Sequence, residues 1–217
     1  MRRLYIIVEG YTEKDFVSQT LAPYFQSLGI YNISPILIRT SKTGKGGFVN
    51  YEHLKNNVKR LLSSEKEVIV STFVDFFRIP TSMPKYEESM RLNADSDKVG
   101  SLELGMFESI DDTRFIPYIQ LHEFEALLFS SNKGFEEYCE ESVHKQTKAV
   151  VDSYENPEDI NSSPETAPSK RLLKINPDYD KVVEGNLIAL EVGIDRMLKK
   201  CPRFREWVEI LIAEVKK

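Results

Sequence analysis

Short, almost uninterrupted apolar runs alternate with segments of helical periodicity in the first part of the chain. The runs cover residues 4–8, 33–38 and 68–74, and they are rich in β-branched side chains. The segments between them repeat apolar residues three and four positions apart, which is the pattern of an amphipathic helix. Strands that are apolar on both sides are typical of parallel sheets covered by helices. The pattern therefore predicts a parallel α/β sheet.

The rest of the chain adds one strand and several helices. Residues 86–110 read as a polar helix that follows the proline at position 84, residues 115–121 read as a fourth strand, and residues 123–129 open another helix. Residues 153–169 hold three prolines and many small polar residues, which is typical of a surface loop, and two amphipathic helices follow. We therefore expect a Rossmann-like α/β core with a mainly parallel four-stranded sheet.

The helix that follows the first strand should start near Thr12, because Asp15 stands three residues later in a pattern that resembles a capping box. We place the α/β core at residues 1–130. Residues 131–217 are expected to form a helical extension packed on that core.

Composition narrows the class of protein. With 41% hydrophobic and 29% charged residues among 217, the chain should fold around a sizeable core. Its longest apolar runs are far shorter than the roughly 20 residues of a membrane span. The apolar run after the basic start is also too short for the apolar region of a signal peptide. Cys139 and Cys201 are too far apart in sequence to suggest a disulfide framework or a zinc site. We expect a cytoplasmic protein without a membrane partner.

The formal net charge of -5 conceals an uneven distribution. Residues 39–60 carry six basic side chains against one acid, whereas residues 136–165 carry nine acids. The glycine-bearing loop at 43–47 lacks the spacing of a nucleotide-binding P-loop. Lys42 and Lys45 on this loop are expected to contact a nucleic-acid backbone, although a solvated loop is an equally plain interpretation.

A second basic pair, Lys170 and Arg171, follows Ser169 at the expected start of a helix. Helix amides and two cations can bind a phosphate together. The alternative is a pair of surface salt bridges to the acidic stretch.

Acidic residues follow three of the expected strands. Glu9 follows the first and Asp75 the third, and the fourth leads into His122, Glu123 and Glu125. Because the carboxyl ends of parallel strands meet at one edge of a sheet, these side chains should lie together. Clustered carboxylates repel one another unless a hard cation such as Mg²⁺ or Mn²⁺ neutralises them. Each acid taken alone could instead cap a helix or begin a turn, and His122 could serve as a hydrogen-bond partner of a carboxylate.

The segment Val8-Glu9-Gly10-Tyr11-Thr12-Glu13 resembles the opening of Toprim domains, which occur in topoisomerases, bacterial primases and OLD-type nucleases. The resemblance implies Mg²⁺-dependent phosphodiester chemistry that uses this glutamate and a later Asp-x-Asp. Phe77 stands where the second aspartate of that motif would be. Glu123 or Glu125 is then the expected replacement ligand.

The whole chain also resembles a bacterial family related to Toprim, the domain of unknown function family 4276. The matching segments beyond the opening motif are Gly46-Gly47, Phe73-Val74-Asp75-Phe76-Phe77, Ile116-Pro117-Tyr118, Leu121-His122-Glu123-Phe124-Glu125, Pro157-Glu158-Asp159, Thr166-Ala167-Pro168-Ser169-Lys170-Arg171-Leu172, Tyr179-Asp180-Lys181 and Cys201-Pro202-Arg203-Phe204 leading to Trp207. The resemblance implies proximity to ABC- or OLD-type ATPases in defence operons.

The acidic edge of the sheet predicts a Mg²⁺- or Mn²⁺-dependent nuclease, and the family resemblance implies that it is a subunit that works with an ATPase in anti-phage defence. Glu9 would act as general base or metal ligand, and Asp75, Glu125 and His122 are candidate metal ligands. Two alternatives stay open. The chain could be a non-catalytic Toprim-fold module that docks on the ATPase, or a phosphotransferase acting on a small molecule. The choice between DNA and RNA and the presence of a homo-oligomer also stay open.

Overall fold

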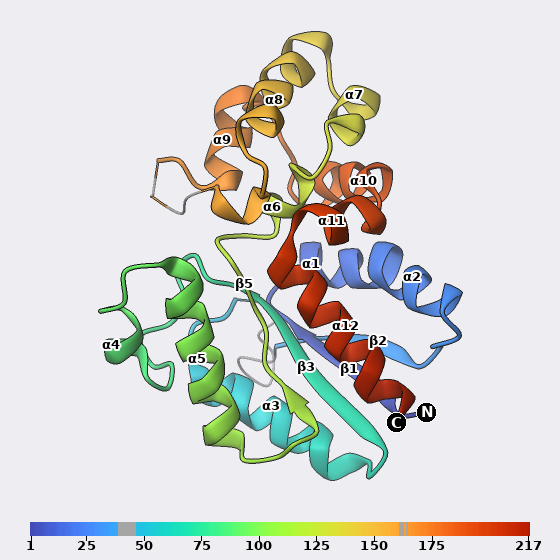
Figure 1. The fold of residues 1–217 in the computed structure, drawn as a ribbon, viewed down its shortest axis with the longest axis vertical. Helices are drawn as coiled ribbons and strands as arrows, with labels where there is room; N and C mark the ends of the chain where they lie inside the picture. Colours follow the sequence, from blue (N-terminus) through green and yellow to red (C-terminus); the bar gives the residue numbers. More distant parts are fainter. Residues whose placement is uncertain (39–46, 161–162, 164) are drawn as a thin grey trace.

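A parallel sheet forms the centre of the protein in this computed structural model, which describes residues 1–38, 47–160, 163 and 165–217. Its main strands are β1 (Arg3–Val8), β2 (Ile33–Leu37) and β3 (Val68–Asp75), and the short strands β4 (Phe115–Ile116) and β5 (Ile119–Gln120) pair with β3. The strand order is β2-β1-β3-β4, and every pairing is parallel (Figure 1). The parallel α/β sheet expected from the sequence is confirmed.

The expected fourth strand, residues 115–121, is broken into β4 and β5. Pro117 lies at the break and has no N–H to donate to the ladder. At the next residue the side chain of Thr72 replaces the ladder, because its Oγ1 accepts a hydrogen bond from Tyr118 N and donates one to Tyr118 O, both at 2.8 Å. The strand therefore keeps its place on β3 through a side chain.

The first helical segment runs without interruption through α1 (Tyr11–Phe16), the π-helical turn η1 (Val17–Leu21) and α2 (Ala22–Ser27). It begins one residue earlier than expected. Glu13, and not the expected Thr12–Asp15 pair, completes its first turn, because Glu13 Oε2 accepts a hydrogen bond from Gly10 N at 2.9 Å. Thr12 is buried.

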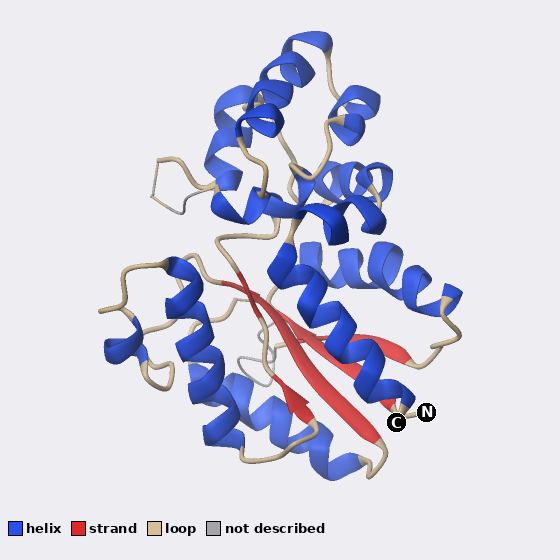
Figure 2. Cartoon of the chain, viewed as in Figure 1, coloured by secondary structure: helices blue, strands red, loops and turns tan. Residues whose placement is uncertain are grey.

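Helices cover both faces of the sheet (Figure 2). Leu4 and Ile6 point to one face with α1 and α2, whereas Ile7 points to the other face with α3 (Tyr51–Ser64) and α5 (Asp95–Ile110). The polar helix expected over 86–110 is two helices, since α4 (Tyr86–Ser89) ends before α5 begins.

The remaining helices belong to the C-terminal half. In chain order they are α6 (Glu125–Leu128), α7 (Lys133–Tyr138), α8 (Glu141–Ser153), the 3₁₀ turn η2 (Pro157–Asp159), α9 (Pro168–Ile175), α10 (Val183–Val192), α11 (Ile194–Lys200) and α12 (Pro202–Lys216). Helices α7, α8 and α9 stand beyond one end of the sheet, whereas α12 lies along its face (Figure 1). One apolar cluster contains residues from both sides of position 130, so the two halves share a core.

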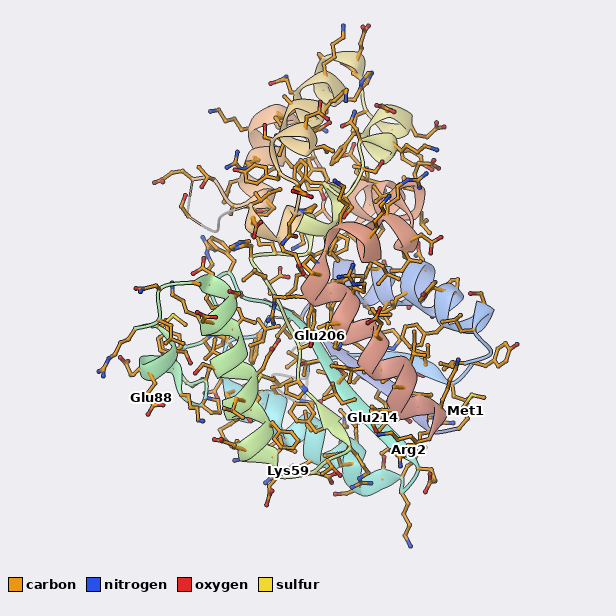
Figure 3. The ribbon with its side chains drawn as sticks, viewed as in Figure 1. Met1, Arg2, Lys59, Glu88, Glu206 and Glu214 are labelled. Carbon is orange, nitrogen blue, oxygen red and sulfur yellow. The ribbon has the colours of Figure 1, made fainter. Side chains whose placement is uncertain are left out.

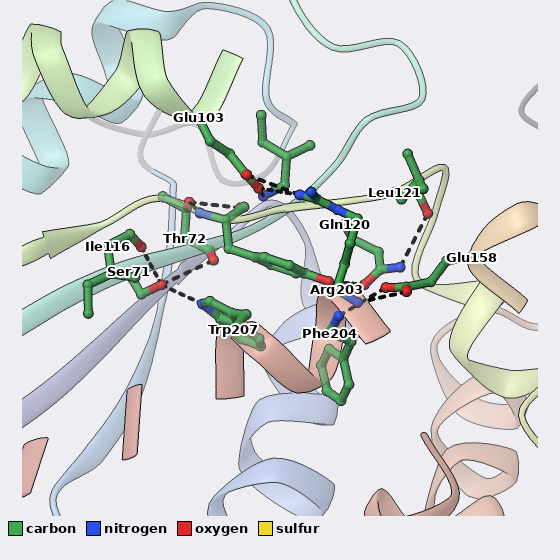
Figure 4. A network of polar contacts seen from close by, with 12 residues as sticks. Ser71, Thr72, Glu103, Ile116, Gln120, Leu121, Glu158, Arg203, Phe204 and Trp207 are labelled. Atoms are coloured by element: carbon green, nitrogen blue, oxygen red, sulfur yellow. Dashed lines mark hydrogen bonds and ion pairs between the residues drawn. The ribbon is translucent and has the colours of Figure 1, made fainter. Parts of the chain in front are cut away.

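Polar contacts join α12 to the sheet, to α5 and to the 3₁₀ turn η2 (Figure 4). Trp207 Nε1 donates to Ser71 Oγ at 2.9 Å, and Arg203 Nη2 binds both oxygens of Glu103 at 2.9 and 3.0 Å. The two oxygens of Glu158 accept from the backbone nitrogens at the start of α12, Arg203 N and Phe204 N. Hydrogen bonds to buried charged groups contribute roughly 1.5–3 kcal/mol each. The position of α12 is therefore set by polar partners as well as by packing.

The two ends of the chain meet. Arg2 N donates to Val215 O at 3.0 Å, and Arg2 Nη1 lies 3.8 Å from Glu214 Oε2, so the first strand and the last helix lie side by side (Figure 3). Among the described residues, no helix combines the length and the apolar character that crossing a membrane requires.

Candidate functional site

Two acids leave the sheet at the same edge. In the parallel pairing of β1 with β3, Val8 lies opposite Phe73, so Glu9 and Asp75 follow at the same end. Backbone amides hold both side chains, because Phe48 N donates to Glu9 Oε1 at 3.3 Å and Phe124 N donates to Asp75 Oδ1 at 2.9 Å. The second of these bonds ties the end of β3 to the segment that carries Glu123 and Glu125.

The structure brings together the four acids that the sequence singled out. Glu9, Asp75, Glu123 and Glu125 all line one pocket of about 330 Å³ at the carboxyl edge of the sheet. Tyr179, Lys181, Lys170, Phe77, Arg78 and Leu173 also line this pocket. The roles assigned to the acids stay predictions, but their grouping is what a shared cation would need.

Lys181 stands at the centre of the acidic group. Its Nζ lies 3.4 Å from Glu13 Oε1 and 3.4 Å from Asp75 Oδ2. It lies 3.3 Å from Glu125 Oε2. Because three carboxylates surround one nitrogen, the ammonium group takes the position that a small cation would take among the same oxygens.

The charges in the pocket do not balance. Burial would lower the pKa of Lys181, but the charges of Asp75, Glu125 and Glu13 outweigh it and raise that pKa well above its ordinary value. Burial raises the pKa of Asp75 well above the usual aspartate range, and the neighbouring glutamates add to the rise. Burial likewise raises the pKa of Glu9. Among the described residues, three carboxylates share the single ammonium group of Lys181, so a further cation or protons would be bound favourably.

The surroundings of the Glu125 carboxylate indicate whether the pocket suits a metal ion. Its side chain has no exposed surface and burial raises its pKa. In the described part of the protein its Oε1 has no hydrogen-bond partner, and its Oε2 has only the ion pair with Lys181. Buried oxygens without partners are costly unless a cation binds them. The donors are carboxylates, which suit Mg²⁺ or Mn²⁺ better than a soft metal. The donor chemistry of these residues therefore suits a hard divalent cation.

As the side chains stand, within residues 1–38, 47–160, 163 and 165–217, no three His, Cys, Asp or Glu side chains are arranged to bind a metal ion directly. Lys181 Nζ lies between the carboxylates that would have to converge. A cation would therefore have to displace this nitrogen from the centre.

Glu123 has a different role from its neighbours. Its Oε2 accepts from Ser169 N at 2.9 Å, and its Oε1 accepts from Ser169 Oγ at 2.8 Å. A carboxylate at the first amides of a helix is stabilised by the helix dipole. Glu123 therefore fixes the start of α9 at the pocket, and both its oxygens already have partners.

The basic residues expected to bind phosphate fall into three groups. Lys170 is exposed and lines the pocket. Arg171 is instead bound within the protein, since its Nε donates to Thr166 O at 2.8 Å and its Nη2 to Tyr154 Oη at 3.1 Å. Lys42 and Lys45 lie outside the described residues.

His122 lies apart from the acidic group. It lines a separate pocket with Asp95 and Asp159, at the start of α5. Its φ of 68° places the backbone in the left-handed region, and burial lowers the pKa of its imidazole. The structure therefore does not place His122 beside Asp75 as a shared metal ligand.

Sequence reasoning missed two members of the site, Glu13 and Lys181. Each lay inside a segment that carried the family resemblance, so a signal was present. Glu13 follows Glu9 by four residues, and Lys181 ends the Tyr179-Asp180-Lys181 motif.

Close packing holds Tyr179 at the pocket, because a Cβ on Gly185 would lie 2.6 Å from Tyr179 Oη.

We expect Mg²⁺ to raise the melting temperature more at pH 8 than at pH 6. The raised pKa values of Glu9, Asp75 and Glu125 mean that the folded protein holds extra protons between the ordinary carboxyl range and the raised values. Stability from these groups is full below the ordinary range and is lost as pH rises through the raised pKa values. Protons and Mg²⁺ then compete for the same oxygens.

The measurement is a thermal shift with and without MgCl₂ at the two pH values. Free Mg²⁺ at 100 times its Kd adds about 2.7 kcal/mol to the free energy of unfolding. For a chain of this size the melting temperature then rises by roughly 5–10 °C. A rise that is identical at both pH values, or unchanged in a Glu9→Gln, Asp75→Asn double variant, would contradict a carboxylate site.

Comparison with known proteins supports the fold and the family. The C-terminal region of the Burkholderia pseudomallei OLD protein matches 99% of this chain over 99% of its own length, with a TM-score of 0.53 and 16% identity. The C-terminal region of the Xanthomonas campestris pv. campestris OLD protein matches 99% of this chain over 95% of its own, with a TM-score of 0.48 and 13% identity. No curated protein sequence matches.

The first of these likenesses confirms the expected Toprim-like fold class. The family model for a domain of unknown function, DUF4276, matches residues 8–212, which include both strand-end acids and Lys181. The chain belongs to the DUF4276 family.

Proposed function

We propose that this protein is a Mg²⁺-dependent nuclease subunit that cleaves phosphodiester bonds. The observation that carries the proposal is the group of buried carboxylates around Lys181 at the carboxyl edge of a parallel sheet. Ligands and catalytic groups collect at this edge in open α/β sheets. The likeness to an OLD C-terminal region supports a Toprim-like module of the kind found in defence proteins.

In this proposal the carboxylates of Asp75, Glu13 and Glu125 hold the cation, with Glu9 as a further ligand or as general base. A bound Mg²⁺ would supply charge neutralisation at the phosphate and a lowered pKa for water. Burial raises the pKa of Glu9, which brings this carboxylate closer to the range in which a general base works well near neutral pH.

Lys181 and Lys170 supply the positive charge that the protein itself brings to the pocket. Lys181 carries an ammonium on a flexible stem and can donate to a phosphate oxygen once a cation satisfies the acids. Lys170 is exposed on α9 beside the same pocket. Together they offset the repulsion between a phosphate and the acidic group.

We also propose that the protein works with a partner that has ATPase activity. The two proteins would act together in the cytoplasm, in defence against phages. The matching region of the Burkholderia protein is the C-terminal part of a longer chain. The sequence motifs that resemble a family near ABC- or OLD-type ATPases point in the same direction.

The test is a cleavage assay on labelled single- and double-stranded DNA and RNA, with Mg²⁺, Mn²⁺ or EDTA, and with and without the ATPase partner and ATP. We expect cleavage with either metal, none with EDTA, and loss of cleavage in Glu9→Gln. Glu137→Gln is the matched control, because Glu137 is exposed on α7. Its activity should equal that of the wild type.

A non-catalytic docking module is the second candidate. Two observations favour it: Lys181 already pairs with the acids, and Phe77 stands where the Toprim motif has a second aspartate. Inactivity of the complete complex on every polynucleotide, together with ATPase binding that survives Glu9→Gln and Asp75→Asn, would establish this second function.

A further inference from the structure

The outer part of the pocket combines aromatic, aliphatic and cationic side chains. Phe77 is partly exposed and lines the pocket, and the Arg78 guanidinium lies over its ring at 5.2 Å from the centroid. Leu173 and Lys170, both on α9, line the same pocket, and Leu173 is 38% exposed. Binding of a cation by the carboxylates gives no role to Phe77, Arg78 or Leu173.

We infer that the pocket accepts an unpaired nucleotide strand, whose base stacks on Phe77 and whose phosphates meet Arg78 and Lys170. This inference rests on the proposed function, because it names the substrate class of the same site. Proteins that bind single strands combine aromatic platforms for the bases with positive charge along the backbone. Arg78 and Phe77 provide both features on adjacent residues.

The backbone fixes this platform. Phe77 N donates to His122 O at 2.9 Å, and Phe76 N donates to Gln120 O at 3.0 Å, so the end of β3 stays paired beyond the sheet proper. The next residue, Arg78, has a φ of 61°, in the left-handed region that few residues other than glycine adopt. Such strain persists only where the surroundings hold it. The aromatic ring is therefore presented from a rigid turn.

The depth of the acids explains why the strand must be unpaired. The side chains of Glu125, Glu13 and Asp75 are 0%, 5% and 13% exposed. Asp75 and Glu125 line a pocket of about 330 Å³ formed by described residues, so a phosphate would approach them through that space. That volume is at the lower end of the range for pockets that hold one small ligand. A nucleotide fits such a space when its strand is single or locally opened, whereas a stacked duplex does not.

The experiment measures binding of fluorescent 12-nucleotide DNA, single-stranded or as a duplex of the same sequence, by anisotropy in Ca²⁺ buffer at fixed salt. The wild type should bind the single strand more tightly than the duplex. Phe77→Leu should weaken single-strand binding about tenfold, because base stacking on an aromatic ring is lost. Phe77→Trp should retain the affinity, and duplex binding should be equal in the wild type and in both Phe77 variants.

Phe107→Leu is the matched control, since Phe107 is a partly exposed aromatic residue on α5 that does not line the pocket. Arg78→Ala and Lys170→Ala should each make the salt dependence of binding shallower by about one charge unit. Melting temperatures measured beside the binding data identify any variant that fails to fold. Phe77→Leu keeps an apolar side chain of similar size, so it provides the informative comparison.

Equal binding of the single strand by Phe77→Leu and the wild type would overturn the inference, as would tighter binding of the duplex. Failure of the proposed function gives a different result. If the wild type cleaves nothing but binds single strands in a Phe77-dependent manner, the nuclease proposal fails and the strand-binding site stands. Cleavage could depend on Glu9 while binding is the same for single-stranded and duplex DNA and the same in Phe77→Leu. In that case the nuclease proposal stands and this inference fails.

Discussion

Replacement of Asp75 by asparagine is expected to lower the rate of phosphodiester cleavage about 1000-fold, the effect of losing several kcal/mol of metal-based stabilisation of the transition state. Asparagine Oδ1 can still accept the hydrogen bond from Phe124 N, so the segment that follows β5 keeps its position. The amide that replaces the other oxygen is neutral and binds a hard cation poorly. Chemistry should therefore be lost while the pocket keeps its shape.

The same variant should be no less stable than the wild type in metal-free buffer. Asp75 is one of several buried acids around a single lysine, and its pKa is raised by burial, so removal of its charge relieves repulsion. Its melting temperature should no longer respond to Mg²⁺. Asp152→Asn, an exposed residue on α8, is the control for both measurements. A single-turnover rate within tenfold of the wild type would show that Asp75 is not a ligand.

Replacement of Lys181 by methionine is expected to lower the free energy of unfolding by about 3–5 kcal/mol at pH 8 without metal, because breaking a buried ion pair leaves charges uncompensated. The carboxylates of Glu13, Asp75 and Glu125 would lose the cation that they share. The melting temperature should fall by roughly 10 °C. At pH 6 the loss should be smaller, since the acids can take up protons.

Mg²⁺ should recover more stability in Lys181→Met than in the wild type, because the cation no longer competes with an ammonium group. Lys148→Met is the matched control. Its exposed pair with Asp152 on α8 is of the kind that contributes about 0.5 kcal/mol or less. Equal melting temperatures for Lys181→Met and the wild type at pH 8 would mean that the acids are protonated and need no counter-charge.

The positions of the strand-end acids could be predicted from the sequence, and the reason is geometric. Parallel strands place their carboxyl ends at one edge, so a residue that follows a buried run is located without knowledge of distant contacts. Glu9 and Asp75 needed only this rule. Glu123 and Glu125 were also located by it, but their different partners, the amides of α9 and the lysine, depend on packing between segments far apart in the chain.

Lys181 could not be assigned a role in this way. It precedes α10 and reaches Asp75 across a sequence separation of 106 residues. No periodicity or strand rule predicts where a loop residue of that kind will lie. His122 shows the reverse case: its position next to Glu123 suggested a shared site, but the backbone at His122 is left-handed and the residue lines another pocket.

Element boundaries show the same division between local and distant causes. The break in the fourth strand has a local cause, because Pro117 interrupts the ladder and Thr72 replaces it. The single helix expected over 86–110 was wrong because apolar spacing alone did not reveal the turn between α4 and α5. Local chemistry could have indicated the first difference, because a proline interrupts a strand wherever it stands.

The position of α12 has a consequence for synthesis of the protein on the ribosome. Phe73 on the sheet stacks against Trp207 at 5.5 Å and packs on Phe204 at 6.3 Å, both from α12. At about 5–20 residues per second, the chain between Phe73 and Phe204 takes on the order of 10 s to make. During that time Phe16 of α1 already covers one side of Phe73, but the part of the sheet face that belongs to α12 stays open. We therefore expect the nascent chain to expose an apolar surface there until the last helix emerges.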